Sequence, residues 1–397
     1  MVFEKNPVYE PREDSMLLKE IVEQYAAGDV LEIGAGSGIL TFASMSMSAV
    51  KKILAVDLNP KSVKYIRESS KDCKDEEKKK LRVKKSDLFS DVDGQFDTII
   101  FNPPYLPAEK DYKDMALDGG KRGHELTTRF LDDVNEYLTQ PGIVLLLFSS
   151  LTGKRKIDEA IDNNCLSKEL LAAKDMGMET LYVYKVEKST LLRDLEMNGV
   201  HDVKRFDKGK RGHIFTGTYK GSKVAIKTKN PSSEASESIN NEIKVLDFFR
   251  NLNFDFIPEV IFTGHNYFVY YFIEGTSLGD FISDSERKKI RMVIRDILMI
   301  CRTLDKEGFN KEEMHRPHKH IFISDGLEIK MIDFERAKET DKPKNVTQFC
   351  QYLTSTQISS RLVEKGICKD VKELRRLSGE YKKEYSDDIA EKIKDLL

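Results

Sequence analysis

The sequence predicts two consecutive domains, an α/β domain with a mostly parallel sheet over residues 1–188 and an α+β domain over residues 200–397. The length of 397 residues supports two or three domains at about 150 residues each, and each would bury its own core. From Asp29 to about Tyr184, short apolar runs alternate with helix-like segments, as in α/β folds. After about residue 188, the pattern changes to paired β-rich runs followed by long charged helices.

Six apolar runs in the first half are each expected to form a strand. They read DVLEIGAG, KKILAVDLN, LRVKKSDLF, FDTIIFNPPY, GIVLLLFSS and ETLYVYKVEK. Near-continuous Val, Ile and Leu runs are typical of parallel strands that helices cover on both faces. In the second half, GHIFTGTYKGSKVAIKTK predicts a β-hairpin with a Tyr-Lys-Gly-Ser turn, and SESINNEIKVLDFFRNL has helical spacing of its apolar positions.

Composition and charge exclude several classes of function. Hydrophobic residues make up 40% and charged residues 33%, and the formal net charge is −2, so no global positive field attracts nucleic acid or anionic lipid. The N-terminus has no apolar signal segment, and the run GIVLLLF is too short to cross a bilayer. The five cysteines are far apart and form no C-x-x-C pair. We expect a cytoplasmic protein with reduced thiols, no membrane contact and no DNA partner.

A glycine-rich turn follows the first expected strand. Gly34, Gly36 and Gly38 stand in VLEIGAGSG, where glycine lets the backbone turn tightly and approach a ligand closely. A G-x-G-x-G pattern alone is weak, because dinucleotide sites share it. Asp57 ends the next strand, where a carboxylate can accept both hydroxyls of a ribose. These positions predict a nucleoside-containing ligand at the strand ends.

Two features distinguish this turn from dinucleotide folds. Its glycine spacing lacks their G-x-x-G ending, and Glu32 stands inside the motif. Both features resemble class I S-adenosylmethionine methyltransferases, and this resemblance implies S-adenosylmethionine as the cofactor, bound by Glu32, the glycines and Asp57. It also places Asp87, in SDLF after the third strand, beside the adenine. The alternative for Asp87 is a solvated strand-end carboxylate or an N-cap.

The run FNPPYLP follows the fourth apolar run and is unusual at the exit of a strand. An amide or exocyclic amine nitrogen is a poor nucleophile, because its lone pair is delocalised. Asn102 and the carbonyl of Pro103 could accept its N–H hydrogens, and Asn102 would also lie at the cofactor. Pro104 restricts the backbone and holds these acceptors in place, while Tyr105 offers a flat face for a planar group. The alternative is a rigid turn without a ligand.

These residues resemble the HemK/PrmC group of glutamine methyltransferases, which modify the Gly-Gly-Gln glutamine of class I release factors. The resemblance covers about residues 1–188. It includes VYEPREDSMLL, which places Glu10, Pro11, Asp14 and Ser15 near the methionine end of the cofactor. Only eight residues precede Tyr9, which is expected for the eukaryotic and archaeal branch that lacks the bacterial N-terminal helical domain. That branch implies a small zinc-binding activator subunit as a partner and a class I release factor as the substrate.

The segment LDGGKRGHELTTRFL, residues 117–131, also resembles that branch. Its Gly119, Gly120 and Gly123 would let a peptide approach the backbone. Adenine and guanine methyltransferases that act on nucleic acid also carry this Asn-Pro-Pro-Tyr sequence, so they remain an alternative. Such enzymes usually have an appended basic, aromatic module, which this sequence does not show.

The second half contains the pattern of a nucleotide-binding site. Gly209 and Gly212 form a glycine loop, and VAIK places Lys227 where it would pair the phosphates of ATP. Glu242 is the helix residue best placed to hold Lys227, and Glu237 is the second choice. YFVYYFIEGTSL predicts the strand and hinge that bind adenine. IKMIDFERA predicts a strand that ends near the metal-binding Asp333.

Counting back from Asp333 tests this interpretation. In protein kinases the catalytic Asp lies about eighteen residues before the metal-binding Asp, and a metal-binding Asn lies about five residues after the catalytic one. Here these positions hold His315 as a general base and His320 as a metal ligand. Glu312 or Glu313 could replace His315.

A third interpretation is a zinc site of His315, His318 and His320, but no Cys or further His lies nearby to complete four ligands. The region of about 200–397 resembles the archaeal predicted serine/threonine kinases that are distantly related to the atypical kinases of the RIO and Bud32 types. This resemblance implies ATP with Mg²⁺ and transfer of phosphate to protein. A pseudokinase that binds nucleotide without transferring phosphate is the alternative.

Overall fold

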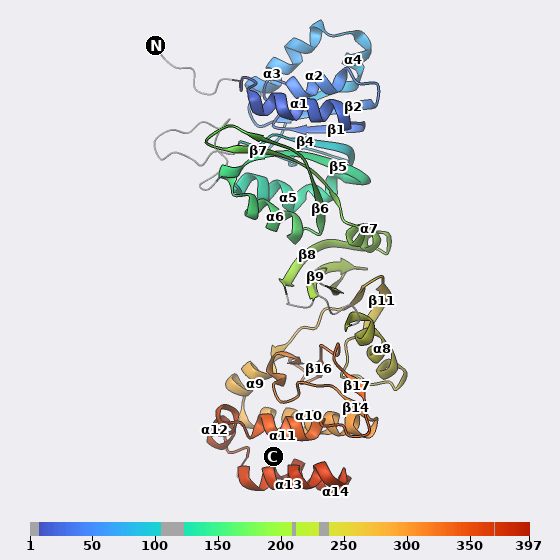
Figure 1. The fold of residues 1–397 in the computed structure, drawn as a ribbon, viewed down its shortest axis with the longest axis vertical. Coiled ribbons are helices and arrows are strands. Elements are labelled where there is room, and N and C mark those ends of the chain that lie inside the picture. The colour runs from blue at the N-terminus through green and yellow to red at the C-terminus, as the bar shows by residue number, and fades with distance from the viewer. Residues whose placement is uncertain (1–7, 105–122, 209–211, 230–237, 369) are drawn as a thin grey trace. The chain divides into compact units, whose positions relative to one another are not determined.

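The computed structural model describes residues 8–104, 123–208, 212–229, 238–368 and 370–397. The chain divides into two compact units, Met1–Arg205 and Phe206–Leu397, coloured from blue to green and from green to red in Figure 1. We describe each unit by itself. Among the helices of these ranges, none is both long and apolar enough to span a membrane.

The first unit is built on a seven-stranded sheet of order β3-β2-β1-β4-β5-β7-β6. Neighbouring strands from β3 to β5 are parallel, and β7 is antiparallel to both β5 and β6. The mostly parallel α/β sheet predicted from the sequence is therefore confirmed. The strands are β1 (Gly28–Ile33), β2 (Val50–Asp57), β3 (Leu81–Lys85), β4 (Phe96–Phe101), β5 (Leu138–Ser149), β6 (Leu166–Asp175) and β7 (Thr180–Lys188).

Helices cover both faces of this sheet. Figure 1 shows α1, α2 and α3 on one side of the sheet and α5 and α6 on the other. The central strands are consequently apolar along their length, and Leu145, Leu146 and Leu147 of β5 are fully buried. The helices are α1 (Glu13–Tyr25), α2 (Ile39–Met45), α3 (Pro60–Ser69), α4 (Asp75–Lys80), α5 (Glu125–Tyr137), α6 (Lys154–Asn163) and α7 (Thr190–Met197).

The register of the parallel strands positions the site. Ile33, the last residue of β1, pairs with Val56 of β2 and with Phe101, the last residue of β4. The loops that follow these three strands therefore leave the sheet at the same edge. In open α/β sheets, ligands bind outside the carboxyl ends of the strands.

Strand β6 is a strand that the sequence analysis did not expect. Its sequence LSKELLAAKD is rich in residues that favour helices, and its pairing with β7 is irregular between Leu170 and Ala172. It lies at the end of the sheet order, and most of its side chains are partly or fully exposed. An edge strand of this kind lacks the continuous apolar run by which the other strands were recognised.

The next sheet along the chain has the order β11-β12-β10-β9-β8, and its pairs β9–β10, β10–β12 and β11–β12 are antiparallel. Strand β8 crosses the division between the units at Arg205, and the other four strands belong to the second unit. The predicted hairpin joins β9 to β10, and its two central turn residues, Lys220 and Gly221, have φ values of 49° and 81°. Positive φ at both positions is the feature of a type I′ turn, whose twist matches that of a hairpin. The strands are β8 (Val200–Lys208), β9 (Gly212–Tyr219), β10 (Ser222–Lys229), β11 (Val260–Gly264) and β12 (Tyr267–Tyr271).

A mostly helical part follows this sheet. Its longest helix, α10, buries Ile290, Ile294, Ile297, Cys301 and Leu304 on one face. Short strands form two small sheets, β13-β15-β16 and β14-β17. The remaining elements are α8 (Ser238–Asn251), β13 (Thr276–Ser277), α9 (Leu278–Asp284), α10 (Arg287–Lys306), β14 (Phe309–Asn310), β15 (Ile321–Ile323), β16 (Ile329–Met331), β17 (Lys338–Glu339), α11 (Asn345–Leu353), α12 (Thr356–Glu364), α13 (Val371–Glu384) and α14 (Asp387–Leu396).

Candidate functional site

The glycine loop of the first unit is held in a shape that few other residues could adopt. Gly34, Gly36 and Gly38 have φ values of 68°, 54° and 78°. The amide of Gly36 donates a hydrogen bond of 2.7 Å to Oδ2 of Asp57, and the amide of Asn59 donates one of 2.7 Å to Oδ1. Asp57 therefore fixes the loop, and the remaining lone pairs of its carboxylate can still accept hydroxyl groups.

The surroundings of the loop fit a ligand. Among the described residues, a Cβ added at Gly34 would have only the ring of Phe101 within 4 Å, at 3.9 Å, so these residues leave space above the backbone. At Gly38 an added Cβ would lie 3.0 Å from Ile66 and Phe42, which shows that this glycine is needed for packing. The first glycine thus leaves room for the expected cofactor, and the third closes the loop onto the core.

Two acidic side chains near the loop are affected by burial. Glu32 is 3% exposed, and burial raises its pKa to about 8. Its carboxyl group accepts a hydrogen bond from the hydroxyl of Thr41 in α2, so Glu32 contacts the first turns of that helix from within the core. Burial also raises the pKa of Asp57, although the amides of Gly36 and Asn59 partly offset this effect.

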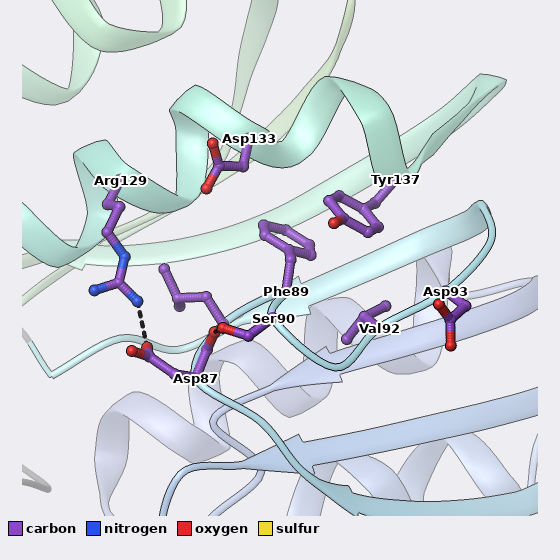
Figure 2. A pocket seen from close by; sticks show the side chains of 9 residues that line it. Asp87, Phe89, Ser90, Val92, Asp93, Arg129, Asp133 and Tyr137 are labelled. Atoms are coloured by element: carbon purple, nitrogen blue, oxygen red, sulfur yellow. Dashed lines mark hydrogen bonds and ion pairs between the residues drawn. The ribbon is translucent and has the colours of Figure 1, made fainter.

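Asp87 lies in the bend after β3 and forms an ion pair with Arg129 of α5, as Figure 2 shows. It lines a pocket of about 560 Å³ with Phe89 and Tyr137, whose rings stack at 4.3 Å. The pocket lining contains none of the loop glycines, nor Asp57 or Asn102. Asp87 is the one residue predicted at the cofactor that lines this pocket, and half of its side chain is exposed.

Asn102 is held in one orientation by the helix that precedes the sheet. Its Nδ2 donates a hydrogen bond of 3.0 Å to Oδ2 of Asp14, the second residue of α1. Asp14 is 4% exposed and also accepts from the hydroxyl of Tyr9 at 2.9 Å. Because a carboxylate can only accept, the amide nitrogen of Asn102 must face Asp14. Its Oδ1 is buried and receives no hydrogen bond from any residue in the described ranges.

Other predicted residues of this site are only partly described. Pro103 is buried and Pro104 is half-buried, directly after Asn102. Tyr105, Gly119 and Gly120 lie outside the described residues. Gly123 has a φ of 83°, just before α5.

A second cluster of charged residues lies in the second unit. Nζ of Lys227 in β10 is 2.6 Å from Oε2 of Glu242 in α8 and 3.1 Å from Oδ1 of Asp333. The ion pair between Lys227 and Glu242 that the sequence suggested is present. Glu242 also accepts a hydrogen bond of 3.0 Å from the amide of Phe334. Burial alone would lower the pKa of Lys227, but Glu242 and Asp333 raise it above its ordinary value.

His320 and Glu313 complete this cluster around Asp333. Ligand atoms of Glu313, His320 and Asp333 all lie within 4.8 Å of one another. His315, which the count from Asp333 indicated as the base, is exposed and is not a member of the group. Glu312, Glu313 and Asp333 have φ values of 59°, 58° and 65°, which non-glycine residues adopt rarely.

Lys311 is a member of this cluster that the sequence analysis missed. It is 3% exposed, and its Nζ donates a hydrogen bond of 3.0 Å to the carbonyl of Asp333. Burial lowers its pKa to about 8. A signal in the sequence could have revealed Lys311. If Glu313 takes the place of the aspartate in the kinase pattern H-R-D, Lys311 takes the place of its histidine, two residues earlier.

The glycines expected over the phosphates are described only in part. Gly209 and Glu237 lie outside the described residues. A Cβ at Gly212 would lie 2.6 Å from the carbonyl oxygen of Thr228, so the close approach of β10 already requires a glycine there. The expected contact of Gly212 with phosphate remains a prediction.

Comparisons with known proteins match the first half of the chain. The methyltransferase small domain family matches residues 12–169. A protein of Methanocaldococcus jannaschii, provisionally named as a protein N5-glutamine methyltransferase, is 40% identical over 181 residues, which cover 44% of this chain and 89% of the relative. Mouse methyltransferase HEMK2 is 28% identical over 193 residues, which cover 46% of this chain and 90% of the relative.

Two further matches are more distant. The release factor glutamine methyltransferase of Streptococcus pneumoniae is 28% identical over 127 residues, which cover 30% of this chain and 44% of the relative. A chain in the solved E. cuniculi Mtq2–Trm112 complex, described as responsible for methylation of the eRF1 translation termination factor, matches with 24% identity and a TM-score of 0.37. The match covers 46% of this chain and 98% of that one.

Proposed function

Because the N-terminal half of this chain belongs to the HemK-type protein N5-glutamine methyltransferases, we propose that its acceptor is the Gly-Gly-Gln glutamine of a class I release factor. The activity of this half is methyl transfer to protein glutamine, and S-adenosylmethionine is the cofactor expected for such a domain. The name of the Streptococcus pneumoniae relative supports a release factor as the acceptor.

The observation that carries this proposal is the orientation of Asn102. Its Oδ1 is a buried acceptor that receives no hydrogen bond from the residues described, while Asp14 holds its Nδ2. A buried acceptor without a donor costs about 1 to 3 kcal/mol, so the site gains when a substrate N–H occupies it. A primary amide supplies two N–H groups, and the carbonyl of Pro103 is a second acceptor in the same segment.

The residues of the chain itself would position the acceptor amide and the cofactor. Asn102 Oδ1 would hold the amide nitrogen through one hydrogen. The loop of Gly34 and Gly36, which Asp57 fixes through the amide of Gly36, would hold the nucleoside part of the cofactor. The cofactor supplies an electrophilic methyl group on sulfur. Asn102 and the carbonyl of Pro103 would keep the amide nitrogen aligned with that methyl group, and the proton that the nitrogen loses on methylation would pass to solvent. This catalysis is mainly by proximity and orientation.

The direct test incubates the full-length protein with a class I release factor and S-adenosylmethionine carrying a labelled methyl group. Mass spectrometry should find the label on the Gly-Gly-Gln glutamine, and a release factor with that glutamine replaced by alanine should stay unlabelled. Label in RNA or DNA would instead support the nucleic-acid methyltransferase alternative. Label on another protein glutamine would reject the release factor while leaving the reaction type intact.

The variant Asn102→Ala tests the residue itself. It should bind S-adenosylmethionine with unchanged affinity but methylate at least about a hundredfold more slowly, since a preorganised polar partner is lost. Asn198→Ala is the matched control, because Asn198 is exposed on the surface at the end of α7. Full activity of Asn102→Ala would reject the assigned role.

We also propose a small zinc-binding activator subunit as a partner, on the basis of the sequence resemblance to the archaeal and eukaryotic branch. Purified alone, the chain should then methylate the release factor weakly. Co-purification with the activator from the same organism should increase the rate, and equal rates with and without it would reject this partner.

For the second unit we propose an atypical, RIO-like kinase fold that binds ATP and transfers phosphate to protein Ser or Thr. The contacts that favour it are those of Lys227 with Glu242 and Asp333, because kinases need a lysine held by a helix glutamate next to a metal-binding aspartate. Lys227→Ala should abolish binding of ATP, whereas the exposed Lys220→Ala should not. ATP binding without phosphate transfer under any metal or pH condition would favour a pseudokinase.

A further inference from the structure

The surroundings of Asp333 form a metal site whose donor set differs from that of an all-oxygen magnesium site. We propose that Glu313, His320 and Asp333 bind one divalent transition-metal ion, for which Mn²⁺ is the probe, in preference to Mg²⁺. This proposal deepens the phosphoryl-transfer function of the second unit and rests on it for what the metal would do. The binding itself can be measured without nucleotide or acceptor.

The distances between the donor atoms suit a shared metal ion. The donor atoms of the three residues lie within 4.8 Å of one another, and Nε2 of His320 is 3.8 Å from Oδ2 of Asp333. This separation is too long for a hydrogen bond between them. Donor atoms around one ion, each about 2.1 Å from it, lie about 3 to 4 Å apart. The three side chains therefore need only small movements to share an ion.

Each of the two carboxylates is anchored by a cation through one oxygen, and Asp333 faces His320 with its other oxygen. Oδ1 of Asp333 faces Nζ of Lys227 at 3.1 Å, whereas Oδ2 is the atom that faces His320. Oε1 of Glu313 accepts a hydrogen bond of 2.5 Å from Nη1 of Arg336. An oxygen of each carboxylate is thus held by a cation, which orients the second oxygen as a ligand.

The backbone of the β15–β16 hairpin sets the position of His320. Ile321 pairs with Met331, and the amide of Ile332 donates a hydrogen bond of 2.9 Å to the carbonyl of His320. His320 therefore lies at the open end of the hairpin, opposite Ile332, which is the residue directly before Asp333. The pairing of β15 with β16 therefore fixes the positions of two ligands, His320 and Asp333.

The third ligand comes from the loop that precedes this hairpin. The amide of Lys311 donates to Asn345 at 2.8 Å, and the amide of Met314 donates to Gln348 at 3.0 Å. These bonds tie both sides of Glu313 to α11.

The chemical type of the three ligands determines which metal ion the site prefers. Mg²⁺ prefers oxygen donors in near-octahedral geometry, and an imidazole nitrogen is a poor substitute. Imidazole suits Zn, Cu, Fe and Ni, whereas carboxylate suits Mg, Ca and Mn. The imidazole of His320 is therefore the ligand that shifts the preference of this set from Mg²⁺ toward a transition metal. Three protein ligands also leave coordination positions open, which phosphate oxygens of a nucleotide could occupy.

The test titrates Mn²⁺ into the full-length protein without nucleotide and follows the free-ion signal by electron paramagnetic resonance. We expect one ion per chain, displacement by Zn²⁺ or Co²⁺ at comparable concentrations, and displacement by Mg²⁺ only at a large excess. His320→Ala and Glu313→Gln should each weaken binding at least tenfold. His320→Asn should reduce the preference for Mn²⁺ over Mg²⁺.

The control variants distinguish this site from a cluster of three histidines in the same loop. His315→Ala changes an exposed histidine and should bind Mn²⁺ like the unaltered protein, whereas a site of His315, His318 and His320 would lose binding. Asn102→Ala, a variant of the first unit, should bind Mn²⁺ with unchanged affinity. Each variant of the second unit should retain methyl transfer, which checks that the protein is folded. Unchanged Mn²⁺ affinity in His320→Ala or Glu313→Gln, or equal competition by Mg²⁺, would overturn the proposal. Mn²⁺ binding without any phosphate transfer would reject only the kinase function.

Discussion

At the scale of single residues, the proposed reaction centre of the first unit includes a contact that spans 88 positions in the sequence, between Asp14 and Asn102. The sequence predicted Asn102 as a hydrogen-bond acceptor and placed Asp14 near the cofactor. It could not show that Asp14 binds the amide nitrogen, because that contact exists only after α1 packs beside the sheet. This contact makes Asp14 a positioning residue for Asn102.

The substitution Asp14→Ala tests this role. Without the carboxylate the amide of Asn102 can rotate, so kcat should fall by roughly 10- to 100-fold, while the KM for S-adenosylmethionine changes little. Asp14→Asn can still accept from Nδ2 through its own Oδ1, so it should recover part of the rate. Initial rates of methyl transfer measure both effects.

Glu13→Ala provides the control, because Glu13 is the exposed neighbour in the same first turn. An equal loss of rate in Glu13→Ala would mean that the acidic turn, and not the contact with Asn102, is responsible. Failure of Asp14→Asn to recover any rate would also contradict the positioning role.

The second unit shows where residue counting reaches its limit. Counting from Asp333 led to His320 and also to His315, yet the structure places Glu313 next to Asp333 and leaves His315 exposed. Glu312 and Glu313 adopt positive φ, and a short 3₁₀ turn over Pro317–Lys319 follows them. A loop with this shape does not keep the spacing of the usual kinase pattern, so a linear count cannot assign its base.

At the scale of elements, the glycine loop was predictable because its signal is local. Positive φ is accessible to glycine, and Gly34, Gly36 and Gly38 stand between a recognisable strand and a helix. Strand β6 was not predictable in the same way, because its partner β7 determines its structure and its own sequence favours a helix. Strands with internal apolar patterns were found, whereas the edge strands β6 and β8 were missed.

The loop glycines allow a matched comparison. Gly38→Ala combines positive φ with contacts of 3.0 Å to Ile66 and Phe42, so it should lower the free energy of unfolding by about 2 to 4 kcal/mol and weaken cofactor binding. Gly94→Ala also has positive φ, at 87°, but open space around its Cβ, so only about 1 to 2 kcal/mol should be lost. Urea unfolding of both variants measures the difference, and equal losses would contradict the packing argument.

Burial of Glu32 against α2 predicts a pH dependence of stability. The pKa of Glu32 in the folded state is about 8, compared with 4.5 for an exposed carboxyl group. Between these values the unfolded chain releases the proton and the folded chain keeps it. The contribution of Glu32 is therefore largest below about pH 4.5 and declines as pH rises to about 8, in total by about 3 to 6 kcal/mol.

The substitution Glu32→Gln removes this titration. Its stability relative to the unaltered protein should increase between pH 5 and pH 8, as measured by thermal unfolding at several pH values. Glu76→Gln, at an exposed position of α4, is the control and should show no such trend. A pH-independent difference for Glu32→Gln would contradict a raised pKa.

At the scale of the whole molecule, the chain combines two compact units with separate clusters of chemistry. The residues around Asn102 belong to Met1–Arg205, and those around Asp333 belong to Phe206–Leu397. We propose that methyl transfer maps to residues 1–188 and phosphoryl transfer to residues 200–397. The family comparisons match the first half, whereas the assignment of the second depends on its own geometry.

This division predicts two separable transitions in differential scanning calorimetry. S-adenosylhomocysteine should raise one melting temperature and MnATP the other, because a ligand stabilises the unit that binds it. At a ligand concentration of 100 times Kd, the stabilisation should be about 2.7 kcal/mol. Lys227→Ala should remove the shift caused by MnATP and preserve the shift caused by S-adenosylhomocysteine. A single transition that both ligands shift equally would contradict independent units.

The hydrogen bond between Asn102 and Asp14 of α1 has a practical consequence for production of the recombinant protein. Tyr9 and Asp14 lie close to the start of the chain, where affinity tags are commonly fused. A tag that displaced this short stretch would yield a preparation that captures cofactor normally yet turns over poorly.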